Sequence, residues 1–168
     1  MSKPVYRKAE TSDLYEIVDL YNAIIEEGGY SADLDKLDPV QRMQWFNELN
    51  TEEYGVYVVL DHDKIVGYFY FSPWRKGRRA LVRTAEVSFY LRSSSRGSGT
   101  GKLMLEWIST VARLRNYRAI LAILLDINLR SKHLLLINDF TVAGHLKDIV
   151  QLNDRTCGQF IMIRYFDN

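Results

Sequence analysis

Three glycines stand at every second position in one short stretch, at Gly97, Gly99 and Gly101. The stretch lies between residues 84–91, which have strand character, and a segment with helical spacing that starts at Leu103. Glycine lets the backbone turn so that several N–H groups point at one anion, and the positive end of the following helix adds to the attraction. The loop therefore predicts a phosphate or pyrophosphate site. A glycine-rich turn without a ligand is the alternative.

Two common phosphate-binding motifs do not fit this loop. A Walker A loop ending at Gly101-Lys102 would need glycine in place of Arg96 and serine or threonine in place of Leu103, so the hydroxyl that binds magnesium is missing. A dinucleotide fingerprint would need a small residue at Lys102, and it should follow the first strand of the chain. The loop therefore disfavours nucleoside triphosphates and NAD, while Arg96 and Lys102 add positive charge suited to a phosphate.

Periodic apolar residues predict the elements that must position this loop. Strand character runs through residues 5–8, 54–60, 65–72, 84–91, 119–125, 141–148 and 160–165. Helical spacing runs from Leu14 to the glycine pair at 28–29, and through residues 39–49, 103–116 and 128–138. The order is mixed rather than a regular alternation of one strand with one helix. It predicts an α+β fold in three layers, with helices on both faces of a central sheet.

The composition is that of an ordinary globular chain. It has 168 residues, with 22 Lys and Arg against 21 Asp and Glu, and its net charge of +1 gives no bulk attraction for nucleic acid. The single cysteine, Cys157, favours a reducing compartment, and His62, His133 and His145 have no zinc-ligand spacing. No export signal or stretch of membrane-spanning length is present. We expect one domain over residues 1–168, soluble and cytoplasmic, with no metal, no nucleic acid partner and no membrane contact.

The glycine loop and the segments before it resemble a known family. Residues 96–103, Arg-Gly-Ser-Gly-Thr-Gly-Lys-Leu, are similar to the coenzyme A pyrophosphate loop of the GNAT superfamily of acetyltransferases. Within it they resemble the phosphinothricin acetyltransferase group, which includes enzymes acting on methionine sulfoximine. Similar segments occur in the same order at residues 20–25, 45–46, 66–68, 71–75 and 84–91. The resemblance implies a mixed, mostly antiparallel sheet, acetyl-CoA as cosubstrate, a small-molecule amine as acceptor, and a homodimer.

The resemblance also implies where acetyl-CoA binds. Its pyrophosphate would lie on residues 97–102, and backbone groups of residues 89–91 would bind the pantetheine arm and the acetyl carbonyl, where an aimed N–H stabilises the developing oxyanion. Asn128 and Ser131 match the family's Asn-x-x-Ser, whose asparagine contacts the arm. The implied cofactor-binding residues are Phe89, Tyr90, Leu91, Arg96, Gly97, Ser98, Gly99, Thr100, Gly101, Lys102 and Asn128.

Glu86 is the candidate base for acetyl transfer to an amine. It lies in an apolar strand, out of step with the alternation of Val87, Phe89 and Leu91. A carboxylate there can take a proton from an ammonium, directly or through water, and burial would raise its pKa toward a useful value. By resemblance it matches the acidic residue that contacts the substrate amine in the phosphinothricin group. The alternative is a strand glutamate that pairs with Arg83 or points to solvent.

Arg75 and Arg78 lie in the densest basic stretch, residues 75–83. The fork of a guanidinium matches a carboxylate, so these two residues would clamp a substrate carboxylate. They resemble the two arginines that follow the family's Ser-Pro-Trp. This chain carries one extra residue between them and has Leu81 in place of the family's aromatic residue, which speaks against an identical substrate. A solvated loop and contact with RNA are the alternatives.

The chain departs from the family after Asn128. Leu135 excludes a tyrosine proton donor at its position, and residues 152–158 lack the family's usual pattern. A thiol of ordinary pKa is a tolerable leaving group without such a donor. Cys157 has no base beside it in the sequence, so we expect direct attack rather than a covalent acetyl-enzyme.

These observations predict an acetyl-CoA-dependent N-acetyltransferase that acts on the primary amine of a small amino acid-like molecule. Glu86 would be the catalytic residue, and Arg75 or Arg78 would hold the substrate carboxylate. Acetylation of a polyamine or of a protein N-terminus is the enzymatic alternative, and the basic loop argues against a polyamine. A protein that binds acyl-CoA without turnover is the alternative from another class, because the C-terminal third is altered.

Overall fold

The computed structural model describes residues 3–167, which carry one seven-stranded sheet with the order β1-β2-β3-β4-β5-β7-β6. The strands are β1 (Val5–Lys8), β2 (Val56–Asp61), β3 (Lys64–Pro73), β4 (Thr84–Leu91), β5 (Ala119–Leu125), β6 (Thr141–Gln151) and β7 (Thr156–Tyr165). The helices are α1 (Leu14–Glu27), α2 (Pro39–Leu49), α3 (Thr100–Leu114) and α4 (Leu129–Leu136). Neighbouring strands are antiparallel except β4 and β5, which are parallel. The expected α+β fold with a mixed, mostly antiparallel sheet is confirmed.

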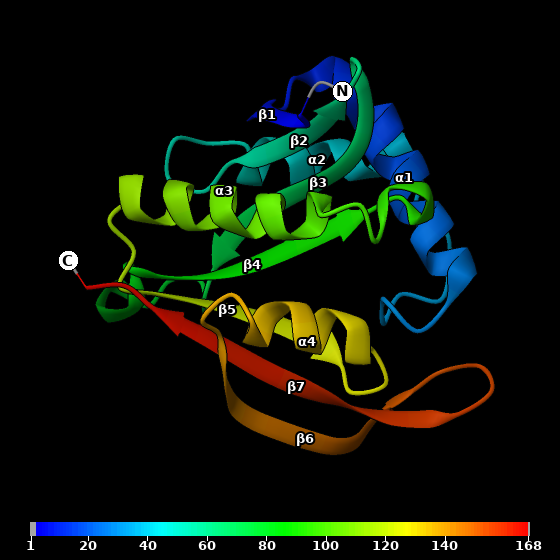
Figure 1. Cartoon of the computed structure of the whole chain (residues 1–168), viewed down its shortest axis with the longest axis vertical. Helices are drawn as coiled ribbons and strands as arrows, with labels where there is room; N and C mark the ends of the chain where they lie inside the picture. Colours follow the sequence, from blue (N-terminus) through cyan, green and yellow to red (C-terminus); the bar gives the residue numbers. More distant parts are fainter. Residues whose placement is uncertain (1–2, 168) are drawn as a thin grey trace.

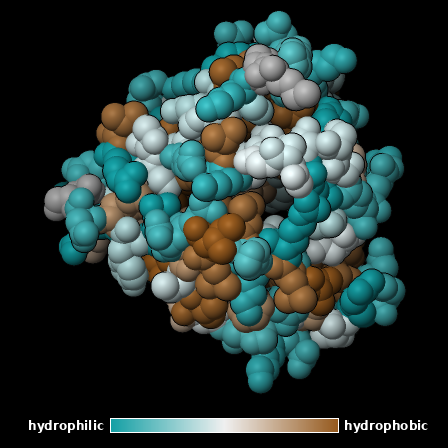
Figure 2. Space-filling model, in the orientation of Figure 1, coloured by the Kyte–Doolittle hydropathy of each residue, from teal (hydrophilic) through white to brown (hydrophobic). Residues whose placement is uncertain are grey.

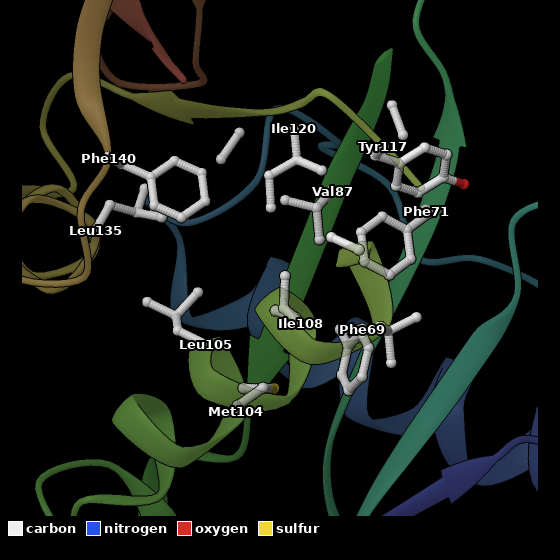
Figure 3. Packing of buried hydrophobic residues seen from close by; sticks show 14 of the residues in the cluster. Phe69, Phe71, Val87, Met104, Leu105, Ile108, Tyr117, Ile120, Leu135 and Phe140 are labelled. Atoms are coloured by element: carbon white, nitrogen blue, oxygen red, sulfur yellow. The ribbon is translucent and has the colours of Figure 1, made fainter. Parts of the chain in front are cut away.

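Helices cover both faces of the sheet (Figure 1). Helices α3 and α4 lie on the face toward the viewer, and α1 and α2 lie behind it. Under α3, Met104 and Ile108 face Phe69 and Phe71 of β3 and Val87 of β4 (Figure 3). A second buried cluster lies between α1, α2 and the opposite face of β2 and β3. Within residues 3–167, no helix has both the length and the apolar character that a bilayer span requires.

Local signals fix the ends of the first two helices. The carboxylate of Asp38 accepts hydrogen bonds from the N–H groups of Val40 and Gln41 at 2.7 and 3.2 Å, and Pro39 occupies the first turn of α2. Helix α1 ends at Gly28, whose φ of +70° favours glycine. These two ends set the length of the α1–α2 loop, which contributes to the site described below.

The parallel strands β4 and β5 stay paired over a short distance. Their register begins at Thr84 with Ala119 and ends at Glu86 with Leu121. From Val87 onward, β4 pairs with β3 alone, and the rest of β5 pairs with β7 alone. The two strands therefore diverge, and the sheet opens between them.

Two features extend beyond the sequence prediction. Strand β6 continues to Gln151 and strand β7 already starts at Thr156. The added end of β6 is mostly exposed, and the added start of β7 contains a glycine, which disfavours a strand prediction although Cys157 and Gly158 are buried. Helix α3 begins at Thr100 rather than at Leu103. Its first residues are small and polar, so the apolar period starts only after the helix has begun.

Candidate active site

A hollow of about 320 Å³ opens where β4 and β5 diverge. Strand β4 contributes Phe89, Tyr90 and Leu91 to its lining, which are the residues expected to bind the pantetheine arm. Residues 122–124 of β5 line the opposite side, and the glycine loop and α4 complete the wall. Because neither strand pairs with the other here, backbone groups at the two strand edges are available to a bound molecule.

The glycine loop has the geometry of an anion cradle. Gly97 and Gly99 have φ values of +85° and +91°, which side chains disfavour, and this backbone pattern turns successive N–H groups toward one side. Within residues 3–167, the N–H groups of Gly97, Ser98 and Gly99 have no hydrogen-bond acceptor. Helix α3 starts at Thr100 with Gly99 as its N-cap, so its positive end points to the same space. The loop is therefore suited to a phosphate, and phosphate binding there stays a prediction.

Arg96 does not simply face the phosphate site, although the sequence predicts that it would. Its Nε donates to the carbonyl oxygen of Leu91 at 3.1 Å, and its Nη1 pairs with Glu27 at the end of α1 at 2.5 Å. The guanidinium also lies 4.5 Å from the centre of the Tyr30 ring. Arg96 therefore ties the loop to α1. Its Nη2 is buried without a partner in the described part of the chain, and Arg96 lines the hollow, so this donor is available to a ligand.

Asn128 and Lys102 line the hollow, as expected of cofactor-binding residues. The Oδ1 of Asn128 accepts the N–H of Ser131 at 3.1 Å and so caps α4. Arg130 also lines the hollow, and sequence reasoning missed it. Its Nη2 lies 3.4 Å from the position that a Cβ on Gly97 would take. A cation inside the Asn-x-x-Ser turn was the signal that could have identified it.

The surface over α4 is largely apolar (Figure 2), where Leu129, Leu136 and Ile137 are exposed. Leu134 and Ile137 line the hollow beneath this surface. The charged groups of the site are therefore confined to the end of α4 that faces the glycine loop. An elongated ligand with a charged end and an apolar arm fits this division.

Glu86 stands at the point where the two strands separate, in the last residue pair between β4 and β5. It is half buried, and within residues 3–167 its carboxylate forms no hydrogen bond or ion pair. Arg83, the alternative partner, instead binds the carbonyl oxygen and Oδ1 of Asn116 at 2.8 and 2.7 Å. Burial raises the pKa of Glu86 above its ordinary value. An unpaired carboxylate with a raised pKa has the properties of a general base.

Aromatic and charged residues share the sheet face of Glu86, on the side of α1 and α2. Tyr70 and Ser88 are paired across β3 and β4 on this face. The Trp45 ring of α2 packs edge-on against Tyr70, with ring centres 5.0 Å apart, and the guanidinium of Arg42 lies 3.9 Å from the Trp45 ring centre. Burial raises the pKa of Tyr70, while the charge of Arg42 lowers it and that of Glu86 raises it. The sequence analysis did not identify Arg42, because α2 carries no motif.

Arg75 and Arg78 lie apart from the hollow. Both are exposed, neither lines it, and their guanidinium groups have no partner within residues 3–167. The adjacent Lys76 is 3.5 Å from Glu48 at the end of α2, which places this turn beside α2. The structure therefore brings Glu86 and the glycine loop to one gap, and leaves the two arginines at the surface nearby.

A second hollow, of about 440 Å³, adjoins the first and shares Tyr30, Asn128 and Arg130 with it. It is bounded by the α1–α2 loop, the β5–α4 turn and residues 152–155 of the β6–β7 turn. The segment in which the sequence departs from the resembled family thus forms one wall of this second hollow.

Comparisons with known proteins agree with this geometry. The model of the acetyltransferase (GNAT) domain family matches residues 7–160. A Bacillus subtilis (strain 168) protein named "Putative phosphinothricin acetyltransferase YwnH" is 30% identical over 149 residues, which is 89% of this chain and 91% of that protein. The L-methionine sulfoximine/L-methionine sulfone acetyltransferase of Pseudomonas paraeruginosa (strain DSM 24068 / PA7) is 26% identical over 148 residues, or 86% of this chain and 84% of that protein.

A solved structure has the same fold. The GNAT superfamily phosphinothricin acetyltransferase of Sinorhizobium meliloti, in complex with AcCoA, superposes with a TM-score of 0.91 at 24% identity, covering 97% of this chain and 88% of that one. The family model, the relatives and the diverging strands beside the glycine loop lead to one conclusion. This chain belongs to the GNAT acetyltransferase family, resembles its phosphinothricin acetyltransferase members, and is an N-acetyltransferase.

Proposed function

We propose that this enzyme transfers the acetyl group of acetyl-CoA to the primary amine of a small amino acid-like molecule by direct attack. One observation carries the proposal. The gap between β4 and β5 begins at a half-buried carboxylate and ends at a glycine loop, and within residues 3–167 neither this carboxylate nor the loop N–H groups have a hydrogen-bond partner. A thioester that enters from the loop would therefore bring its carbonyl toward Glu86.

Acetyl-CoA would occupy this gap with its phosphate end at the glycine loop. The pyrophosphate would lie on residues 97–102, and the pantetheine arm would run along β4 past Leu91 and Phe89. An N–H at the unpaired edge of β4 would then point at the acetyl oxygen and stabilise the oxyanion. Asn128 and the free Nη2 of Arg96 are side-chain donors in the same hollow. The AcCoA-bound relative from Sinorhizobium meliloti supports this choice of cosubstrate.

The reaction then needs one proton transfer before attack. Glu86 takes a proton from the substrate ammonium, directly or through water, and the freed amine attacks the thioester carbonyl carbon. A C–N bond forms, the attacking nitrogen gives up its second proton to solvent, the C–S bond breaks, and CoA leaves as a thiolate that takes a proton from solvent. Cys157 is buried, and burial raises the pKa of its thiol, so it is not suited to carry the acetyl group.

The acceptor would carry a carboxylate or a similar anion. By resemblance, Arg75 or Arg78 holds this group, and the relative that is named for methionine sulfoximine and sulfone supports an amino acid-like acceptor. The structure adds a third candidate, Arg42, on the same face of the sheet as Glu86. Arg42 is half buried, whereas Arg75 and Arg78 are exposed. A guanidinium against an aromatic ring is well placed to receive a carboxylate.

Two further properties complete the proposal. We expect a homodimer in the cytoplasm, as the resemblance implies. Exposed apolar residues on the edge strand β6, namely Val142, Leu146 and Ile149, support a partner on that side. The continuity of one sheet from β1 to β6 supports a single domain.

A thiol-release assay tests the proposed function. Acetyl-CoA is mixed with the enzyme and a panel of free amino acids that includes L-methionine sulfone, and products are identified by mass spectrometry. The proposal predicts thiol release that depends on the acceptor, with acetylation at its amine. Release that is equal with and without every acceptor, or binding of acetyl-CoA with no acetylated product, would contradict it.

A further inference from the structure

A second guanidinium lies over the glycine loop. The Nη2 of Arg130 is 3.4 Å from the position that a Cβ on Gly97 would take, so the group lies beside the part of the loop whose backbone N–H groups have no acceptor within residues 3–167. Arg130 is exposed, and within residues 3–167 no carboxylate pairs with it. It lines both hollows. Its charge is therefore free to meet a ligand that rests on the loop.

The position of Arg130 is electrostatically unfavourable without a ligand. Arg130 lies in the first turn of α4, where the positive end of the helix repels a cation. Lys102 and Arg96 line the same hollow, and in the described part of the chain Arg96 alone of these three cations has a carboxylate partner, Glu27. A multiply charged anion on the loop would attract all three and would offset the repulsion among them.

We infer that Arg130 binds the pyrophosphate of acetyl-CoA and closes the glycine loop from the side of α4. This inference rests on the proposed function, because it takes CoA as the ligand. The loop supplies N–H groups on one side, and the planar fork of the guanidinium supplies charge-assisted hydrogen bonds on the other. The sequence predicts that Arg96 adds positive charge at the phosphate, but Arg96 is held against Glu27 and Leu91. Arg130 therefore supplies this charge.

CoA also carries a 3′-phosphate, which is a different target for the same guanidinium. The position of Arg130 beside Gly97 favours the pyrophosphate, because the loop N–H groups that have no acceptor within residues 3–167 are there. Dephospho-CoA lacks the 3′-phosphate and keeps the pyrophosphate. Comparing the two ligands therefore shows which phosphate Arg130 contacts.

The test is calorimetric titration of CoA and dephospho-CoA into the wild type and three variants, Arg130→Gln, Arg130→Lys and Lys132→Gln. Lys132 is the matched control, because it lies on the same helix and loses the same charge. Its Nζ lies 3.8 Å from the Phe160 ring centre, and it lines neither hollow. Arg130→Gln should weaken both ligands about tenfold, by the same factor. Arg130→Lys should weaken them less, and Lys132→Gln should stay within about twofold.

Each other result has a definite meaning. Equal affinities of Arg130→Gln and Lys132→Gln would overturn the role of Arg130. A loss confined to CoA would also overturn it, because the guanidinium would then contact the 3′-phosphate. Failure of the wild type to bind either ligand would refute the proposed function itself. Without ligand, Arg130→Gln should melt at or above the wild-type temperature, because it removes a cation from the start of α4; a lower melting temperature would contradict the electrostatic argument.

Discussion

Replacing Glu86 by glutamine removes the proposed base and keeps the shape of the side chain. Within residues 3–167 the Glu86 carboxylate has no hydrogen bond or ion pair, so the substitution breaks no contact. Glu86 also lies outside the lining of the hollow. The variant should therefore fold as the wild type does, and its affinity for acetyl-CoA should stay within about twofold.

The expected loss of turnover is that of a general base. Positioned bases contribute about 10²- to 10⁴-fold, and each tenfold step corresponds to about 1.4 kcal/mol of barrier. Glu86→Gln should therefore lower kcat by that factor, or about 3 to 5 kcal/mol. Burial raises the pKa of Glu86 in the folded state, so its ionisation costs stability. That cost is absent below the pKa that Glu86 has in the unfolded chain. It grows as pH rises through the higher pKa that Glu86 has in the folded protein. Glu86→Gln should thus match the wild type in acid and be more stable at neutral pH.

The assay is thiol release at saturating acetyl-CoA with the best acceptor of the amino acid panel, measured across pH. In the wild type, kcat should rise with pH through the raised pKa of Glu86, and this acid limb should be missing in Glu86→Gln. Thermal melting and acetyl-CoA titration of both proteins serve as controls. An unchanged kcat with the same acid limb would remove Glu86 from the mechanism. A lower melting temperature at neutral pH would refute the argument from burial.

Two other substitutions separate acceptor binding from chemistry. Arg42→Gln should raise KM for a carboxylate-bearing acceptor about tenfold, because a charge-assisted hydrogen bond is lost, while kcat and acetyl-CoA affinity change little. An equal rise in KM for an acceptor whose carboxylate is replaced by an amide would contradict this prediction. Cys157→Ala should keep turnover within about twofold, because its buried thiol is packed among Leu125 and Leu152 and does not react. Intact-mass spectrometry after exposure to acetyl-CoA should show no acetylated protein, and an adduct that disappears in Cys157→Ala would show a covalent route instead.

Local patterns in the sequence predicted most of the elements. The predicted ends of β1 and β5 are those of the structure, although only β5, a continuous apolar run that is almost entirely buried, crosses the core, and β1 is an edge strand that is at most half buried. The outer ends of β6 and β7 are not predicted, because the end of β6 is mostly exposed and the start of β7 contains a glycine and no apolar alternation. Helix α3 was placed one turn late for the same reason, because its first turn is polar.

The site was predictable where its signals are local. The spacing of Gly97 and Gly99 indicates a positive φ at both and an anion-binding loop. Glu86 interrupts the apolar alternation of its strand. The separation of β4 from β5 cannot be read from either strand alone, because it depends on how far each pairs with its other neighbour, β4 with β3 and β5 with β7. It is this tertiary feature that places Glu86 at the edge of the gap.

The charges of the site were harder to predict because their partners are distant in the sequence. Arg96 pairs with Glu27, 69 residues away, and no local pattern gives this contact. Arg130 reaches Gly97 across the space between α4 and the loop. Arg42 meets its aromatic neighbour Tyr70 through Trp45, from three separate positions in the chain. The sequence therefore predicts the glycine loop and the candidate base, and the structure adds the cations around them.

The most direct test of acetyl-CoA binding at the glycine loop is calorimetric titration of the wild type, Gly99→Val and Gly77→Val with acetyl-CoA. Gly99 and Gly77 have similar φ values, +91° and +83°, with open space around the position of a Cβ, so valine strains both loops alike. Gly77 lies outside the hollow. Acetyl-CoA should bind the wild type and Gly77→Val with micromolar affinity, one molecule per chain, and Gly99→Val at least tenfold more weakly. No binding by the wild type, or equal weakening in both variants, would contradict the account.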